Sequence, residues 1–192
     1  MRILIFASGS GSNAENLVRY FSEPDNSKSG IVVGIVCNNF QAGVIERAKR
    51  LDIECLVVSN EQWKDSDFML AAILKFRAEL AVLAGFLRPF PKSLIDYFEG
   101  NVINLHPALL PKFGGKGMYG MNVHNAVISQ KETQSGITIH WVNEQYDKGQ
   151  IIAQFSCNVE EGDTAESLAQ KIHHLEGRYF PEVVKRVIAE IS

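Results

Sequence analysis

The stretch RILIFASGSGSN, residues 2–13, decides the fold of this chain. Residues 3–7 form a continuous apolar run, which is typical of a strand covered on both faces. Two glycines follow in the turn at residues 8–12, and the amphipathic stretch 13–21 predicts a helix. A buried strand, a tight turn and a helix begin a β-α-β unit, so we expect a mostly parallel sheet.

The same alternation continues to the middle of the chain, with right-handed crossovers expected between the strands. Further strands are predicted at 31–37, 53–58, 80–84 and 102–105, and helices at 42–51, 65–76 and 92–98. The sequence therefore predicts an α/β fold: a single Rossmann-like domain whose sheet is flanked by helices on both faces.

The second half of the chain has a different sequence pattern from the first. Residues 113–122 are rich in glycine and predict an irregular loop before a helix at 123–129. Strands at 135–142 and 150–157 could pair antiparallel, which would make the sheet mixed. Residues 164–191 predict a long helical region that Pro181 should kink or break near Phe180. No repeat or linker divides the chain, so we expect one domain over residues 1–192.

Composition narrows the function. The 192 residues are 46% hydrophobic and 21% charged with a net charge of −3, which is ordinary for a globular protein and argues against nucleic acid as the main partner. No apolar run approaches the ~20 residues that span a bilayer. The three cysteines are widely spaced and predict free thiols in a reducing compartment, so we expect a cytoplasmic protein without membrane contact.

The turn at residues 8–13 has the chemistry of a phosphate cradle. Its glycines let the backbone approach an anion, and the following helix offers free N–H groups. Ala14 replaces the third glycine of a dinucleotide fingerprint, and Cys37-Asn38-Asn39 stands where an acidic ribose partner would be. A single phosphate, as on a ribosyl 5′-phosphate, fits better than a dinucleotide. The alternative is a tight turn without a ligand.

A second polar motif ends the strand at 102–105. Asn104 and His106 are two residues apart, so they share one face, and Pro107 ends the strand beside them. In open α/β sheets ligands bind beyond the carboxyl ends of the strands. Asn can stabilise an oxyanion, and His can transfer a proton near neutral pH. The alternative is a structural, hydrogen-bonded histidine.

Residues 104–113, NLHPALLPKF, resemble the signature of the folate-dependent formyltransferases, and the order of motifs over the whole chain is similar to that family. The resemblance implies the formyltransferase fold and transfer of a formyl group from 10-formyltetrahydrofolate to the amine of 5′-phosphoribosylglycinamide (GAR) in purine biosynthesis. It also implies a phosphate-binding half at 1–100 and a catalytic, folate-binding half at 101–192. No metal is expected, because no group of ligands has convincing spacing.

The resemblance assigns the site residue by residue. The implied catalytic residues are Asn104, His106 and Asp147, the last placed by the preceding strand GITIH at 136–140. Gly11, Ser12, Asn13 and Glu176 would bind GAR. The implied folate-binding residues are Lys64, Leu87, Arg88, Pro89, Phe90 and Asn104, and the loop at 142–147 would close over the pteridine.

The roles of several residues are left open. Residues 114–121 are longer than the short Pro-Gly-x-His stretch common in the family, so no role is carried over to them, and Pro89 and Phe90 replace more flexible aliphatic residues. Leu87 and Phe90 could belong to the core. Thr138 and His140 could be core-edge residues, and the remaining histidines, His124, His173 and His174, are expected on solvated helix faces.

Three other functions compete with this one. A methionyl-tRNA formyltransferase would need a further C-terminal RNA-binding domain. A formyltetrahydrofolate hydrolase would usually carry a regulatory domain and would need no phosphate turn. A non-catalytic phosphate-binding module would not depend on the polar triad. We expect small-molecule partners only, and a monomer or weak homodimer.

Overall fold

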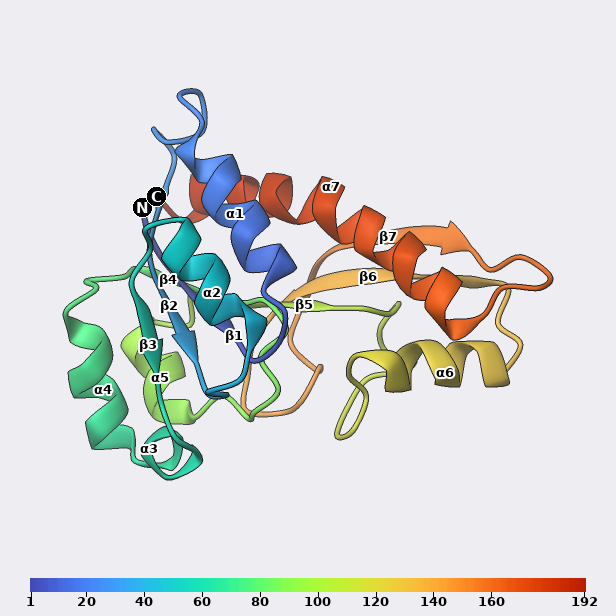
Figure 1. Ribbon diagram of the computed structural model, residues 1–192, viewed down its shortest axis with the longest axis horizontal. Coiled ribbons are helices and arrows are strands. Elements are labelled where there is room, and N and C mark those ends of the chain that lie inside the picture. The colour runs from blue at the N-terminus through green and yellow to red at the C-terminus, as the bar shows by residue number, and fades with distance from the viewer.

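A computed structural model describes residues 1–192 and shows one seven-stranded sheet with helices on both faces (Figure 1). The strand order is β3-β2-β1-β4-β5-β6-β7, with parallel pairing from β3 to β5 and antiparallel pairing of β6 and β7. The strands are β1 (Arg2–Ala7), β2 (Ile31–Cys37), β3 (Cys55–Val57), β4 (Leu80–Leu83), β5 (Val102–His106), β6 (Gln134–Trp141) and β7 (Ile151–Asn158). The predicted α/β class and the mixed sheet are confirmed.

Seven helices cover the sheet. They are α1 (Ser12–Ser22), α2 (Gly43–Arg50), α3 (Asn60–Lys64), α4 (Ser66–Leu74), α5 (Lys92–Tyr97), α6 (Met121–Ser129) and α7 (Ala165–Ile191). Only α3 was not predicted. It is a five-residue helix whose capping box, from Ser59 and Gln62, is too local to stand out as a periodic pattern. None of the helices combines the length and apolar character needed to cross a membrane.

A separate hydrophobic core lies on each face of the sheet. Successive side chains of β1 point alternately into one core and the other. Ile3 and Ile5 pack with buried residues of α1, α2, α6 and α7. Leu4 and Phe6 pack with buried residues of α4 and α5. Both faces are thus covered, which explains why the strands read as continuous apolar runs.

Helix α7 runs unbroken from Ala165 to Ile191, so the break predicted at Pro181 does not occur. Proline has no N–H, so the carbonyl of Gly177, four residues earlier, loses its helical donor. Asn16 on α1 replaces that donor: its Nδ2 lies 2.9 Å from the Gly177 oxygen. A side chain 161 positions away in the sequence therefore satisfies the group that proline would leave free.

This contact predicts a coupling between Asn16 and Pro181. Asn16→Ala should lower the free energy of unfolding by about 1 kcal/mol, because the Gly177 carbonyl loses its partner. In the Pro181→Ala background residue 181 can itself donate to that carbonyl, so the same change should cost less. Urea denaturation of both single variants and the double variant measures the coupling. An equal cost of Asn16→Ala in both backgrounds would contradict this account.

Candidate active site

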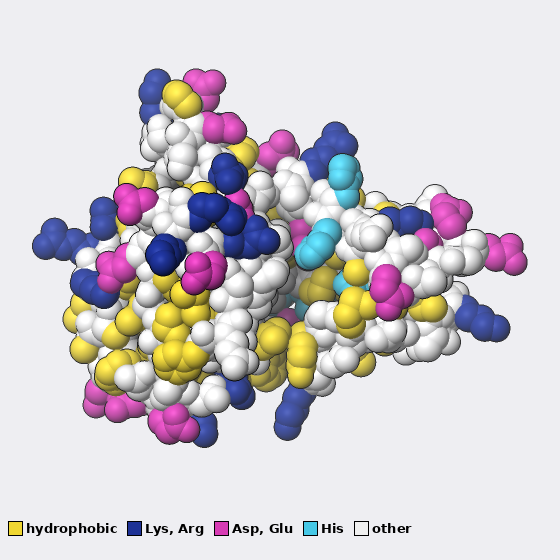
Figure 2. All heavy atoms as spheres, in the orientation of Figure 1, with side chains coloured by type: hydrophobic (Ala, Val, Ile, Leu, Met, Phe, Trp, Pro, Cys, Tyr) yellow, Lys and Arg dark blue, Asp and Glu magenta, His cyan; other side chains and the backbone are white.

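A cleft of about 880 Å³ opens at the carboxyl ends of β1, β4 and β5. It lies near the centre of the face in Figure 2, where histidine side chains gather around the hollow. Its walls come from the turn before α1, the segment after β4, the loop between β6 and β7, the glycine-rich residues before α6, and α7. The cleft lies where parallel sheets place their ligands.

The antiparallel pairing of β5 with β6 places Asn104 opposite His140. The Asn104 Nδ2 atom lies 3.0 Å from His140 Nε2, and His140 Nδ1 lies 2.9 Å from the carbonyl oxygen of Trp141. Because a carbonyl only accepts, Nδ1 carries the proton, and a neutral His140 accepts at Nε2. Asn104 therefore presents its amide nitrogen to His140 and keeps its second N–H for another partner.

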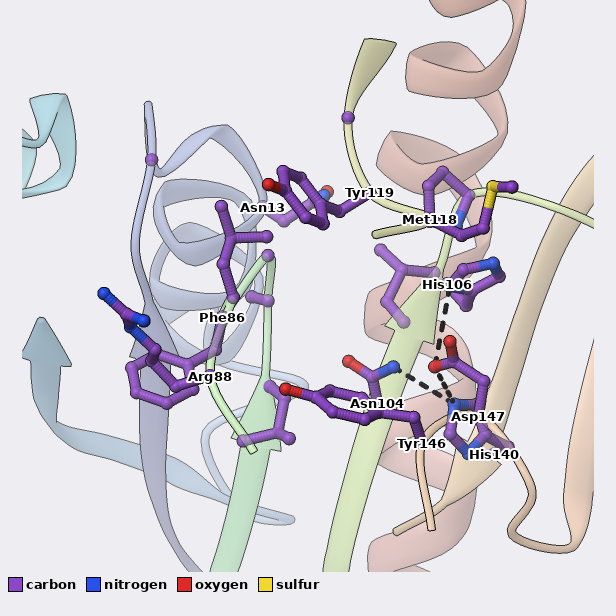
Figure 3. A pocket seen from close by; sticks show the side chains of 18 of the residues that line it. Asn13, Phe86, Arg88, Asn104, His106, Met118, Tyr119, His140, Tyr146 and Asp147 are labelled. Atoms are coloured by element: carbon purple, nitrogen blue, oxygen red, sulfur yellow. Dashed lines mark hydrogen bonds and ion pairs between the residues drawn. The ribbon is translucent and has the colours of Figure 1, made fainter. Parts of the chain in front are cut away.

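Asp147 lies between two buried imidazoles (Figure 3). Its Oδ1 atom is 3.6 Å from His106 Nδ1 and 3.6 Å from His140 Nε2. The other nitrogen of His106, Nε2, donates to the carbonyl oxygen of Phe113 at 2.8 Å. The predicted residues Asn104, His106 and Asp147 thus meet in one place. His140, left open between core and function, joins them.

Burial and the neighbouring groups have opposite effects on the pKa values of His106 and Asp147. Burial lowers the pKa of His106 below its usual value, while the Asp147 carboxylate and the Phe113 carbonyl act to raise it. Burial alone would raise the pKa of Asp147, but the nearby His140 imidazole, the charge of His106 and the Gly115 N–H hold it below its usual value. Asp147 therefore stays ionised near neutral pH and favours the protonated form of His106.

Thr138 fixes the chain just after His106. Its hydroxyl donates to the Ala108 carbonyl at 2.6 Å and accepts from the Leu110 N–H at 3.0 Å. Gln154 Nε2 donates to the same hydroxyl at 2.9 Å and to the Leu110 carbonyl at 3.0 Å. Thr138 is fully buried, so its role is to hold residues 108–110 beneath the cleft. The Leu110–Pro111 peptide bond is cis.

The turn before α1 forms the opposite end of the cleft. Gly11 has a left-handed φ of 79°, and a Cβ there would lie 2.5 Å from Val44 Cγ2, so only glycine fits. No side chain caps α1, which leaves its first N–H groups directed at the cleft without a side-chain acceptor. Asn13 Nδ2 donates to Glu176 Oε2 at 2.9 Å. Gly11, Ser12, Asn13 and Glu176 therefore lie together, as predicted.

His173 differs from its prediction. We expected a solvated residue without a site contact, and its side chain is indeed 65% exposed, but Nδ1 bonds Glu176 Oε2 at 2.8 Å. This hydrogen bond raises the pKa of His173. The contact with Glu176 thus favours the charged form of His173 at this end of the cleft. His174, the next residue, is exposed and does not line the cleft, as expected.

His124 was predicted on a solvated helix surface, and that prediction is wrong. The side chain is 6% exposed, and burial lowers its pKa. Helix α6 packs against α7, so the face that carries His124 turns inward with Val123 and Val127. A single histidine in a short helix gives no sequence signal for which face is covered.

The segment after β4 forms a third wall with Leu87, Arg88, Pro89 and Phe90. Leu87 is 45% exposed in the cleft, whereas Phe90 is 7% exposed and packs edge-on against Phe6. Phe90 therefore serves the core as well as the wall. Lys64 is exposed at the end of α3 and does not line the cleft, so the structure does not bring it to the predicted folate wall.

Several cleft residues were not predicted individually, among them Met118, Tyr119 and Tyr146. Met118 and Tyr119 extend from the glycine-rich residues before α6, and Tyr146 lies beside Asn104 (Figure 3). Tyr146 was included only within the predicted loop 142–147, all of which lines the cleft. No group of three or more metal-ligating side chains is arranged to hold a metal ion.

Known proteins of one family are similar to this chain. The formyl transferase family matches residues 1–184. A protein named phosphoribosylglycinamide formyltransferase, chloroplastic, from Arabidopsis thaliana is 39% identical over 98% of this chain, which spans 66% of that relative's length, just under two thirds. Phosphoribosylglycinamide formyltransferase of Bacillus subtilis is 35% identical over 97% of this chain and 94% of its own length.

Solved structures agree as well. The crystal structure of phosphoribosylglycinamide formyltransferase from Brucella melitensis superimposes with a TM-score of 0.87 at 31% identity, covering 98% of this chain and 95% of that one. The corresponding structure from Bacillus halodurans gives 0.86 at 29% identity, covering 100% and 97%. With the family match over nearly its whole length, this chain belongs to the formyl transferase family.

Proposed function

We propose that this protein transfers the formyl group of 10-formyltetrahydrofolate to the amine of GAR, as an enzyme of purine biosynthesis. The observation that carries the proposal is a single cleft that joins the Asn104, His106 and Asp147 group to the glycine turn with Glu176. The names of the relatives from Arabidopsis thaliana and Bacillus subtilis support the same acceptor.

The chemistry needs a stabilised oxyanion and a proton acceptor. The acceptor amine attacks the formyl carbon, and the negative charge that develops on the formyl oxygen is stabilised by the free N–H of Asn104 and by the charge of protonated His106. Asp147 favours protonated His106 and accepts the amine proton through water. Each stabilising donor of this kind contributes ~3–4 kcal/mol to lowering a barrier. When the tetrahedral intermediate collapses, the bond between the formyl carbon and the folate nitrogen breaks, and that nitrogen takes up a proton to leave as tetrahydrofolate. Direct amine attack requires no acyl-enzyme.

The formyl acceptor, GAR, and the formyl donor, the folate, bind different walls of the cleft. The phosphate of GAR binds the N-terminus of α1 at Gly11, Ser12 and Asn13, where N–H groups and the helix dipole favour an anion. Glu176 holds the glycinamide amine. The folate lies against residues 87–90 and beneath the loop 142–147, whereas Lys64 does not line the cleft. This keeps the phosphate-binding role in residues 1–100 and the catalytic role in 101–192.

We further propose a cytoplasmic enzyme that is a monomer or weak homodimer. The three free cysteines fit a reducing compartment. The phosphate turn counts against a hydrolase. The burial of the Asn104, His106 and Asp147 group counts against a non-catalytic module, because a binding protein has no need of a carboxylate between two buried imidazoles.

The function predicts acceptor-dependent turnover. With 10-formyltetrahydrofolate and GAR, release of deformylated folate should require GAR, and His106→Ala should lower kcat about 10²–10⁴-fold. His174→Ala, an exposed neighbour of the cleft, is the control and should keep wild-type turnover. Release without GAR would support a hydrolase instead. Wild-type turnover in His106→Ala would refute the catalytic assignment.

The acceptor end predicts a different kinetic change. Glu176→Gln removes the charge that holds the amine and His173, so KM for GAR should rise about tenfold, which corresponds to about 1.4 kcal/mol of binding. The exposed Glu182 on the same helix gives the matched control Glu182→Gln. A lower kcat with an unchanged KM would move Glu176 from binding to chemistry.

The catalytic pair predicts a pKa change. Asp147 acts to raise the pKa of His106, so Asp147→Asn should lower that pKa further below its usual value. NMR titration of the His106 ring resonances measures it, and Glu144→Gln in the same loop controls for a change in loop charge. A His106 pKa that is unchanged or higher in Asp147→Asn would show that the ion pair does not form.

A further inference from the structure

Two backbone groups of the glycine segment, residues 113–120, contact the catalytic pair. The Phe113 carbonyl accepts from His106 Nε2 at 2.8 Å, and the Gly115 N–H donates to Asp147 Oδ2 at 2.8 Å. Gly115 lies among residues 114–121, to which the family resemblance carried over no role, and Phe113 directly precedes them. The segment therefore holds each member of the pair from the side away from the other.

The segment passes too close to Asp147 to carry a side chain at residue 114. A Cβ on Gly114 would lie 2.6 Å from Leu110 Cδ2 and 3.2 Å from Asp147 Cβ. Leu110 is 6% exposed, so its side chain has little room to move. A methyl group at residue 114 would therefore press on both side chains, and Asp147 would have to shift by a few tenths of an ångström. Gly115 has a φ of 95°, a left-handed conformation that turns its N–H toward the carboxylate.

The segment is a compact unit joined to α6. The Met118 N–H donates to the Gly115 carbonyl at 3.1 Å, and Asn122 Nδ2 donates to the Gly117 carbonyl at 3.1 Å. Its position relative to Asp147 is thus set by internal hydrogen bonds and by the start of α6. Closing the chain between Lys112 and α6 does not require contact with Asp147, so loop closure alone does not explain the two bonds to the pair.

We propose that the glycine segment is a positioning element for catalysis, and that Gly114 is a positioning residue whose missing side chain sets the place of the Asp147 carboxylate beside His106. The proposal rests on the proposed formyl transfer and adds to it a role for residues 113–115. Both backbone contacts favour charged partners: a carbonyl accepts from a protonated imidazole, and an N–H donates to an ionised carboxylate.

Few other titratable groups face the pair. His140 on β6 lies 3.6 Å from Asp147, and Tyr146, in the same loop as Asp147, lies between the charges of Arg88 and Asp147. None of them belongs to the glycine segment, whose own contacts with the pair are backbone groups that do not titrate. A change at Gly114 therefore reaches His106 through the position of Asp147.

The test is Gly114→Ala. We expect kcat to fall about tenfold, because a displacement of well under 1 Å at a reacting group is costly, with KM for GAR and folate little changed. The NMR pKa of His106 should fall as the carboxylate moves away. Gly30→Ala is the matched control: its Cβ would lie 3.0 Å from Ile188 Cδ1, so it crowds the core far from the cleft. It should lower Tm but leave kcat and the His106 pKa at their wild-type values.

A second variant, Gly115→Ala, allows the test to be made if Gly114→Ala does not fold. Gly115→Ala has no atom within 4 Å of the new Cβ, but it strains the left-handed φ and so should turn the N–H away from Asp147. It should lower kcat and the His106 pKa in the same direction. A wild-type His106 pKa in both folded variants would overturn the proposal, even if kcat falls. The titration needs no turnover, so it remains decisive if the wild-type protein fails to formylate GAR and the proposed function fails.

Discussion

The site depends on one register, the pairing of Asn104 with His140 where the sheet changes from parallel to antiparallel. Because side chains alternate along a strand, a slip of β6 by one residue would turn His140 away from Asn104. The same register places His106 opposite Thr138, whose hydroxyl holds the chain that leaves β5. It also sets where β6 ends at Trp141, and therefore where the loop with Asp147 begins. Catalytic geometry thus follows from backbone pairing.

Much of this could be predicted from the sequence, because the signals are local. Apolar runs and amphipathic stretches located every strand and every helix except α3 to within a few residues. The motif at 104–107 combines a strand end, two polar residues on one face and a proline, all within four positions. The glycine turn is equally local, and a parallel sheet brings both to the same edge. Local pattern and topology were sufficient to predict which end of the sheet is functional.

What could not be predicted depends on contacts between distant residues. Pro181 is tolerated inside α7 because Asn16, on another helix, donates to Gly177. The sequence near His140 says only that it lies on a strand, and its bond to Asn104 arises from the register. His124 is buried because α6 packs on α7. Lys64 was expected beside the folate, but α3 ends on the surface away from the cleft. Each result requires knowledge of which elements meet.

Two of the three carboxylate–imidazole contacts in the cleft, His106 with Asp147 and His173 with Glu176, differ in distance and in solvent exposure. His106 is 4% exposed beside Asp147, and burial lowers its pKa, whereas His173 is 65% exposed beside Glu176 and its pKa is raised. The contact with Glu176 favours the charged form of the exposed imidazole. The pKa of the buried imidazole is below its usual value even with Asp147 beside it, and the carboxylate acts against that lowering, so the pKa depends on the position of Asp147. This difference fits the proposed division of the cleft into a binding end and an end for proton chemistry.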